Sequence, residues 1–118
     1  MLTKDKAIEV LNIDDKVKTC PISLFKNDTI ILYIGRCRES TIVSVNGEKW
    51  VGMEKIYNRQ FGYVLDFILN ESEIHKPLKV GDIVYCDPYV GEIMPYEFEQ
   101  ELLYFKVVKK SEINIIIN

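Results

Sequence analysis

The strongest constraint on the fold of this chain is the dipeptide Asn46-Gly47, which lies between two runs rich in apolar and β-branched residues. Asn-Gly between such runs is the strongest short-range signal of a β-hairpin, because both turn positions need a positive φ angle. The sequence therefore predicts a hairpin in which residues 41–45 pair with residues 48–53.

Further strands are predicted on both sides of this hairpin. Residues 29–34 form a nearly unbroken apolar run, which is typical of a strand buried on both faces. Gly81 and Asp82 form a turn that leads into a strand at residues 83–86, where Ile, Val and Tyr favour β-structure. The other predicted strands are residues 61–69, 102–108 and 113–117. Loops are predicted at residues 55–60 and around Gly91 and Pro95.

The first 28 residues differ from this β-rich remainder and are predicted to form an accessory arm. Thr3 can cap a helix over residues 4–11, which has about two turns and must dock on something to be stable. The pair Asp14-Asp15 then interrupts the helical pattern. The face that the helix would bury consists of Ala7, Ile8 and Leu11. We expect the arm to pack on its own domain or on a neighbouring subunit.

Length and charge limit the function. A chain of 118 residues is one domain, here divided into the arm at residues 1–28 and a β-domain at residues 29–118. The net charge is −3 and the 15 Lys and Arg residues are scattered, which disfavours nucleic acid as a partner. The densest basic group is Lys106, Lys109 and Lys110, which we expect to be a solvated strand end.

The sequence also disfavours a membrane or secreted protein. No apolar run approaches the ~20 residues that a membrane span needs. The charged amino end, with no apolar segment after it, predicts that there is no signal peptide. The three cysteines are an odd number without CxxC spacing, which favours a reducing, cytosolic setting and buried thiols. They are Cys20, Cys37 and Cys86.

Nothing in the sequence amounts to a catalytic or metal site. His75 is the only imidazole, and nothing orients it toward Cys86 and Asp87 as a base toward a nucleophile. Three alternating glutamates share one face of a strand and are expected to form an ordinary solvated face. They are Glu97, Glu99 and Glu101. We therefore expect a protein that is not an enzyme and that needs no cofactor or metal.

Three short motifs follow one another in the second half of the chain. They are Gly62-Tyr63-Val64-Leu65, Val80-Gly81-Asp82-Ile83-Val84 and Lys110-Ser111-Glu112-Ile113, the last lying between two strands. With a first strand at residues 29–34, their order and spacing resemble the co-chaperonin family, the GroES-like lids of chaperonins. The resemblance spans residues 29–118. It implies an all-β fold, a small GroES-like β-barrel with a β-hairpin excursion, to which this chain adds its amino-terminal arm.

The resemblance also implies a function. Proteins of this family form rings, heptamers among them, that cap a chaperonin and help large substrates to fold. The chain would then be a cytoplasmic homo-oligomer of a bacterium or a phage-infected cell, with a chaperonin as its partner. In the family the terminal strands join neighbouring subunits. Open apolar sheet edges are normally covered, so the expected oligomer contacts are Ile30, Ile31, Ile113, Ile115 and Ile117.

The family's mobile loop carries a short apolar triad that docks on the chaperonin. Residues 36–61 correspond to that loop, and the spacing places Lys49-Trp50-Val51 where the triad should lie. The expected partner-binding tip consists of Trp50, Val51 and Met53, with Ile42 and Val43 across the hairpin. Trp50 as hairpin core is the alternative. A second function also stays open, namely a non-enzymatic structural or assembly component, such as a virion protein, that binds no chaperonin.

Overall fold

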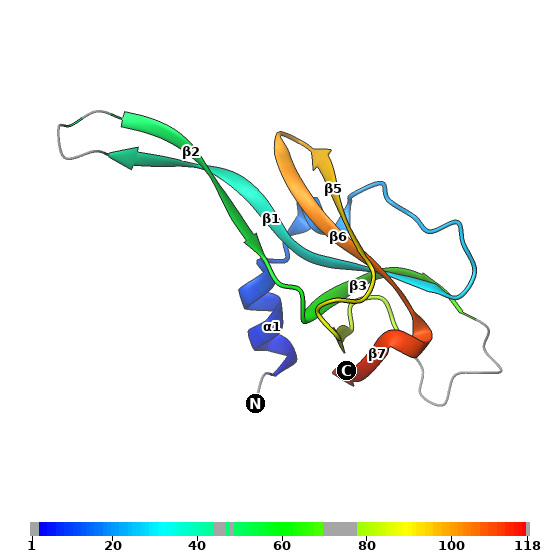
Figure 1. Cartoon of the computed structure of the whole chain (residues 1–118). Helices are drawn as coiled ribbons and strands as arrows, with labels where there is room; N and C mark the ends of the chain where they lie inside the picture. The colour runs from blue at the N-terminus through cyan, green and yellow to red at the C-terminus, as the bar shows by residue number, and fades with distance from the viewer. Residues whose placement is uncertain (1–2, 44–46, 48, 70–77, 118) are drawn as a thin grey trace.

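The computed structural model describes residues 3–43, 47, 49–69 and 78–117, and of residues 38–43 and 49–56 it describes the backbone alone. Two short helices precede a mostly antiparallel sheet (Figure 1). The helices are α1 (Lys4–Leu11) and α2 (Asp15–Lys18). The strands are β1 (Thr29–Val43), β2 (Lys49–Tyr57), β3 (Phe61–Ile68), β4 (Ile83–Cys86), β5 (Glu92–Phe98), β6 (Glu101–Lys109) and β7 (Ile113–Ile117), with the 3₁₀ turn η2 (Lys110–Glu112) before β7.

The strands form one seven-stranded sheet in the order β5-β6-β1-β3-β4-β7, with β2 paired to β1 beside this path. The all-β prediction is confirmed, but the expected closed barrel is wrong, because the sheet is open and β5 and β7 lie at its two ends. Pro95 lies within β5. Because proline has no N–H, β5 cannot offer a complete ladder to a further strand, which suits an edge.

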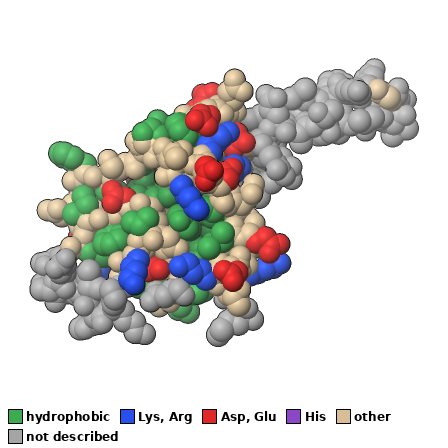
Figure 2. Space-filling model, turned by 180° about the vertical axis from the view of Figure 1, so that it is seen from behind, with side chains coloured by type: hydrophobic (Ala, Val, Ile, Leu, Met, Phe, Trp, Pro, Cys, Tyr) green, Lys and Arg blue, Asp and Glu red, His purple; other side chains and the backbone are tan. Residues whose placement is uncertain are grey.

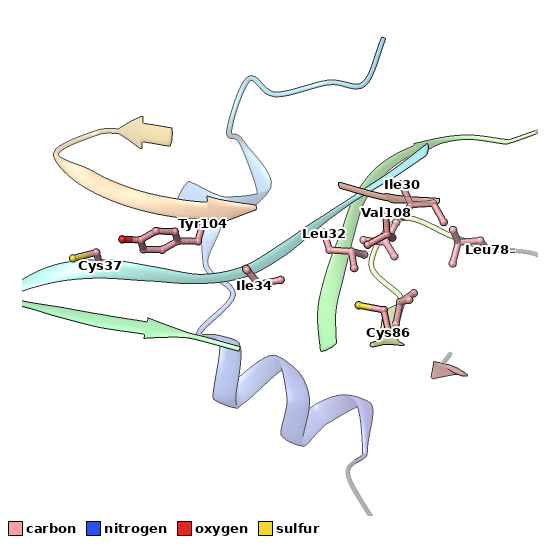
Figure 3. Close-up of a cluster of buried hydrophobic side chains, with 10 residues drawn as sticks. Ile30, Leu32, Ile34, Cys37, Leu78, Cys86, Tyr104 and Val108 are labelled. Carbon is pink, nitrogen blue, oxygen red and sulfur yellow. The ribbon is translucent and has the colours of Figure 1, made fainter. Parts of the chain in front are cut away.

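The open sheet nevertheless curls around a buried interior. β4 and β6 are separated in the sheet by β1 and β3, yet Cys86 of β4 and Val108 of β6 belong to the same buried cluster as Leu32 of β1. We call this cluster the inner core. Figure 3 shows Ile30, Leu32, Leu78, Cys86 and Val108 gathered at one end of the inner core, with Cys37 of β1 and Tyr104 of β6 toward the other end.

The amino-terminal arm covers the opposite face of the sheet. Ala7, Leu11 and Val17 pack there with side chains of the central strands, and we call this second cluster the outer core. From the sheet it takes Ile31, Tyr33, Phe61, Ile83, Leu103 and Phe105. The helix predicted at residues 4–11 is confirmed, and the Thr3 side chain accepts a hydrogen bond from the backbone N–H of Lys6 at 3.2 Å.

The helical pattern is interrupted after Leu11, as predicted, but a second helix that was not predicted follows: the Asp14 carboxylate accepts the backbone N–H of Val17 at 3.1 Å and caps α2. Two local predictions were wrong. Residues 55–57 belong to β2 rather than to a loop. The stretch with Pro95 is strand β5, since an edge strand tolerates a missing N–H.

One part of the sheet leaves the body of the protein. β1 pairs with β3 only as far as Tyr33 and with β6 only as far as Cys37, whereas its pairing with β2 runs from Gly35 to Val43. Beyond Cys37, therefore, β1 and β2 form a two-stranded ribbon. Figure 1 shows this ribbon projecting away from the other strands, and it contributes to overall dimensions of 62 × 32 × 26 Å.

Candidate functional site

The projecting β1–β2 hairpin carries all five residues predicted for partner binding. Its ladder places Ile42 opposite Trp50, which is the one predicted pair that the backbone brings together. The other three lie opposite residues outside the predicted set: Val43 faces Lys49, Val51 faces Thr41 and Met53 faces Glu39 in the register. The side chains of these residues lie outside what the structure describes.

The turn of the hairpin agrees with the sequence in part. Gly47 has a φ of 81°, the positive value that an Asn-Gly turn requires, whereas Asn46 lies outside the described residues. A two-residue turn at this place would put Val43 opposite Trp50, but the structure puts it opposite Lys49. The predicted hairpin is therefore confirmed, and its register differs by one residue from that of a two-residue turn. A shift of one residue changes which side chains meet across a ladder.

At the base of the hairpin Arg36 joins β1 to the arm. Its guanidinium is buried and donates hydrogen bonds to four partners. They are the Tyr33 hydroxyl (2.8 Å), the Asp14 carboxylate (3.0 Å), the Glu101 carboxylate (2.8 Å) and the backbone carbonyl of Asn12 (2.6 Å). Asn12 has a φ of 54° at the end of α1, so Arg36 also satisfies a carbonyl at the corner between the two helices.

The interactions in this network stabilise the charged forms of Arg36 and Asp14. The hydrogen bond from Arg36 lowers the pKa of Asp14, outweighing the effect of its partial burial. Burial lowers the pKa of Arg36, but its hydrogen bonds to Asp14 and Tyr33 prevail and raise it above its ordinary value. Lys16 adds a second link, with Nζ 3.5 Å from the Glu101 carboxylate and 3.2 Å from the carbonyl of Glu99. Glu101 is thus part of an ion-pair network, contrary to the solvated face that we expected.

The return strand of the hairpin is anchored as well. The ring of Tyr57, at the end of β2, lies 4.9 Å from the ring of Tyr104 on β6. Next to it, the backbone N–H of Asn58 donates to the carbonyl of Ile34 at 2.8 Å. The Asn58 side chain accepts the N–H groups of Gln60 and Phe61, which turns the chain into β3. Both strands therefore leave the body from fixed positions.

A second buried cation, Lys106, lies on the other face of the sheet. We expected Lys106, Lys109 and Lys110 to form a solvated strand end, and this prediction was wrong for Lys106, which is 0% exposed, whereas Lys109 is exposed. The Nζ of Lys106 donates to the carbonyls of Arg59 (3.0 Å) and Asp87 (2.9 Å) and lies 3.4 Å from Cys86 Sγ. The signal was present in the alternation of β6, because Lys106 shares its strand face with the inner-core residues Tyr104 and Val108.

The isoleucines predicted for oligomer contacts fall into two groups. Ile30 and Ile31 are 0% and 1% exposed within the chain, so their side chains are not accessible to a neighbouring copy. β7 lies at the edge of the sheet and pairs with β4 alone. Its Ile115 is 57% exposed, and Ile113 and Ile117 are half-buried. Figure 2 shows that hydrophobic side chains also reach the surface of the body on the face seen there, among interspersed charged residues.

The remaining candidates give no site. Of the part of the chain that the structure describes, no group of His, Cys, Asp and Glu is arranged to hold a metal, and no helix is long and apolar enough to cross a membrane. His75 lies outside the described residues. Comparison of the chain with protein-family models, curated proteins and solved structures found no match.

Proposed function

We propose that this protein is a co-chaperonin-like ring protein that caps a chaperonin and assists protein folding. The observation that carries the proposal is the β1–β2 hairpin, which projects from the sheet between the first strand and the Gly62-Tyr63-Val64-Leu65 strand. This is the place in chain order that the co-chaperonin family gives to its chaperonin-binding loop.

The anchored base of the hairpin favours a binding role. Arg36 and Tyr57 fix the two strands where they leave the body. A segment whose ends are held in place loses less conformational entropy when it docks than a free loop does. Trp50, near the tip, is the kind of large side chain that often dominates an interface.

The edges of the sheet favour assembly into a ring. β7 is apolar, has no proline and carries exposed Ile115. Such an edge tends to pair with another chain. Contact between β7 and a different surface of the next copy is heterologous, and it closes into a ring when the rotation permits.

A structural or assembly role without a chaperonin is the second candidate. The same anchored base favours it, because a hairpin with fixed ends is also suited to a permanent contact between subunits. The two functions differ in partner, so a binding experiment separates them.

The test is native mass spectrometry of the full chain alone and with a chaperonin and ATP. We expect an oligomer of defined size and, with the chaperonin and ATP, a capped complex. Replacing both Trp50 and Val51 by alanine should weaken capping at least about tenfold, because truncating such an anchor typically costs ≥ ~2 kcal/mol. The oligomer should remain intact.

A matched control is Val10→Ala, an exposed apolar residue on the arm. It should leave capping unchanged. A monomer at tens of micromolar would contradict the ring. An oligomer that does not bind the chaperonin would instead favour the structural role. If the double variant unfolds, Trp50 is core.

A further inference from the structure

Lys106 and Cys86 form an amine–thiol pair in the inner core that the proposed function does not use. The two residues are 0% and 4% exposed, and Nζ lies 3.4 Å from Sγ. They come from β6 and β4, strands that are not neighbours in the sheet. The contact therefore crosses the inner core between two strands that are not paired with each other.

The surroundings of Lys106 orient its nitrogen toward the sulfur. The carbonyls of Arg59 and Asp87 accept two of its N–H groups at 3.0 and 2.9 Å. The third position on nitrogen faces Cys86 Sγ. Among the partners that the described part of the chain gives Lys106 there is no carboxylate. The amine is thus held against the thiol by fixed backbone acceptors.

We propose that Lys106 and Cys86 form a covalent, thiol-reversible S–N bond, a sulfenamide, when the protein meets a peroxide. The reacting atoms already lie at the separation of about 3–3.5 Å that characterises a near-attack arrangement. A cysteine sulfenic acid condenses with a backbone nitrogen to a sulfenamide, and here the lysine amine takes the place of that nitrogen.

The reaction balances in two steps. In the first, the Cys86 thiolate attacks one peroxide oxygen, the O–O bond breaks, and the hydroxide that leaves takes a proton from the Lys106 ammonium to become water. In the second, the neutral Lys106 amine attacks the sulfenic sulfur. The S–O bond breaks, an S–N bond forms, and the hydroxyl leaves with an amine proton as a second water. Sulfur is oxidised by two electrons and the peroxide is reduced.

The bond would tie β4 directly to β6 across the inner core. Burial raises the pKa of the Cys86 thiol, and the nearby Lys106 only partly offsets this. Because the thiolate is the reactive form, the step is slow and responds to sustained rather than brief exposure to peroxide. A reducing thiol would reopen the link.

The test uses the full chain with Cys20 and Cys37 replaced by serine, so that no disulfide can form. After incubation with hydrogen peroxide we expect the intact mass to fall by that of two hydrogens. Cys86 and Lys106 fall in the same tryptic peptide, residues 80–106, and with the link we expect no cleavage after Lys106, so that trypsin releases residues 80–109 lighter by two hydrogens. Dithiothreitol should restore both the mass and the cleavage.

Lys106→Arg in the same background is the matched control, because it keeps the charge and the donors but removes the amine. It should lose no mass, and its Cys86 should be captured by a sulfenic-acid probe instead. Both chains should be checked for cooperative melting first. If the Lys106→Arg substitution prevents folding, Lys109 and Lys110 of the parent chain serve as internal controls, and a link to either would overturn the proposal. Cys86 that stays reduced, or that goes to sulfinic acid without a link, would overturn it as well.

Discussion

The two buried cations lie on opposite faces of the sheet and are satisfied in different ways. Arg36, on the outer face, pairs with the carboxylates of Asp14 and Glu101. Lys106, on the inner face, has two backbone carbonyls and a thiol. The planar guanidinium offers several donors in a fixed fork that suits carboxylates, whereas an ammonium is a compact charge.

This difference reflects what each cation holds together. Two of Arg36's four partners come from the arm, which also packs on the sheet through the outer core. The partners of Lys106 all belong to the β-domain and lie next to its strand ends. Arg36 therefore makes the hairpin base depend on a docked segment, while Lys106 closes the interior of the sheet itself.

Removing the arm should have the largest effect on stability, because it takes away partners of Arg36 and none of Lys106. Deleting residues 1–19 removes Ala7, Leu11 and Val17 from the outer core, exposes the apolar face beneath them and leaves Arg36 without Asp14 and Asn12. Burial of each larger apolar side chain is worth about 1.5–3 kcal/mol. We expect a loss of stability of several kcal/mol in urea denaturation, with increased binding of a hydrophobic dye.

The same deletion should leave the inner face less affected. Amide exchange at the hairpin base, around the paired residues Gly35 and Tyr57, should rise through local opening in addition to global unfolding. An unchanged melting temperature and an unchanged oligomer would mean that the arm is a free tail.

Arg36→Met should have the next largest effect. It leaves the Asp14 and Glu101 carboxylates facing a partly buried, apolar site, and breaking a buried ion pair on one side typically costs about 3–5 kcal/mol. We expect a loss at the lower end of that range, because both carboxylates retain contact with solvent. Chemical denaturation measures it. Lys6→Met, which removes an ion pair with Glu9 between two exposed side chains, is the matched control and should change stability little.

Lys106→Met should cost less than Arg36→Met. The methionine fills a similar volume and leaves no unpaired charge, and the loss is that of two carbonyls that no longer have a donor, about 1–3 kcal/mol each if they stay dry. The net loss of stability is smaller than the sum for the two carbonyls, because the variant no longer has to bury the charge of Lys106. If Lys106→Met lowers stability more than Arg36→Met does, our inference that Arg36 contributes more to stability than Lys106 is wrong.

The sequence predicted one of these faces better than the other. The outer core could be predicted in part, because Thr3 and the spacing of Ala7 and Leu11 define α1 through local interactions alone. The Arg36 network could not, because Asp14, Arg36 and Glu101 lie far apart in the sequence and only the folded sheet brings them together.

The inner face was harder for a different reason. Lys106 follows the alternation of β6, but a lysine among apolar residues indicates a solvent-facing position unless its carbonyl partners are known. β5 was missed because Gly91 and Pro95 are usual signs of a loop, and the tolerance of an edge strand for proline depends on the sheet order. The hairpin was predicted from Asn46-Gly47, whereas its register depends on the whole β1–β2 ladder.

The smallest effect that we predict is a dependence of stability on acid. The pKa of Asp14 is lowered from 3.8 in the folded protein, mainly by its hydrogen bond to Arg36. The unfolded state therefore binds a proton more readily, and stability falls as the pH drops. The contribution of Asp14 is fully present above its unfolded pKa and is lost as the pH falls through its folded pKa. Its side chain is 44% exposed, so solvent screening keeps the effect modest.

Asp14→Asn isolates this contribution, since asparagine caps α2 as well as aspartate does but cannot carry the charge. At neutral pH the variant should be less stable than the parent, and the difference should shrink as both are titrated into acid. Glu101 and Lys16 also face Arg36 or its partners, but both are present in the two chains, so Asp14 is the charge that differs between them. Urea denaturation at a series of pH values measures it. A difference that stays constant, or that grows toward low pH, would show that Asp14 acts as a helix cap and not through its charge on Arg36.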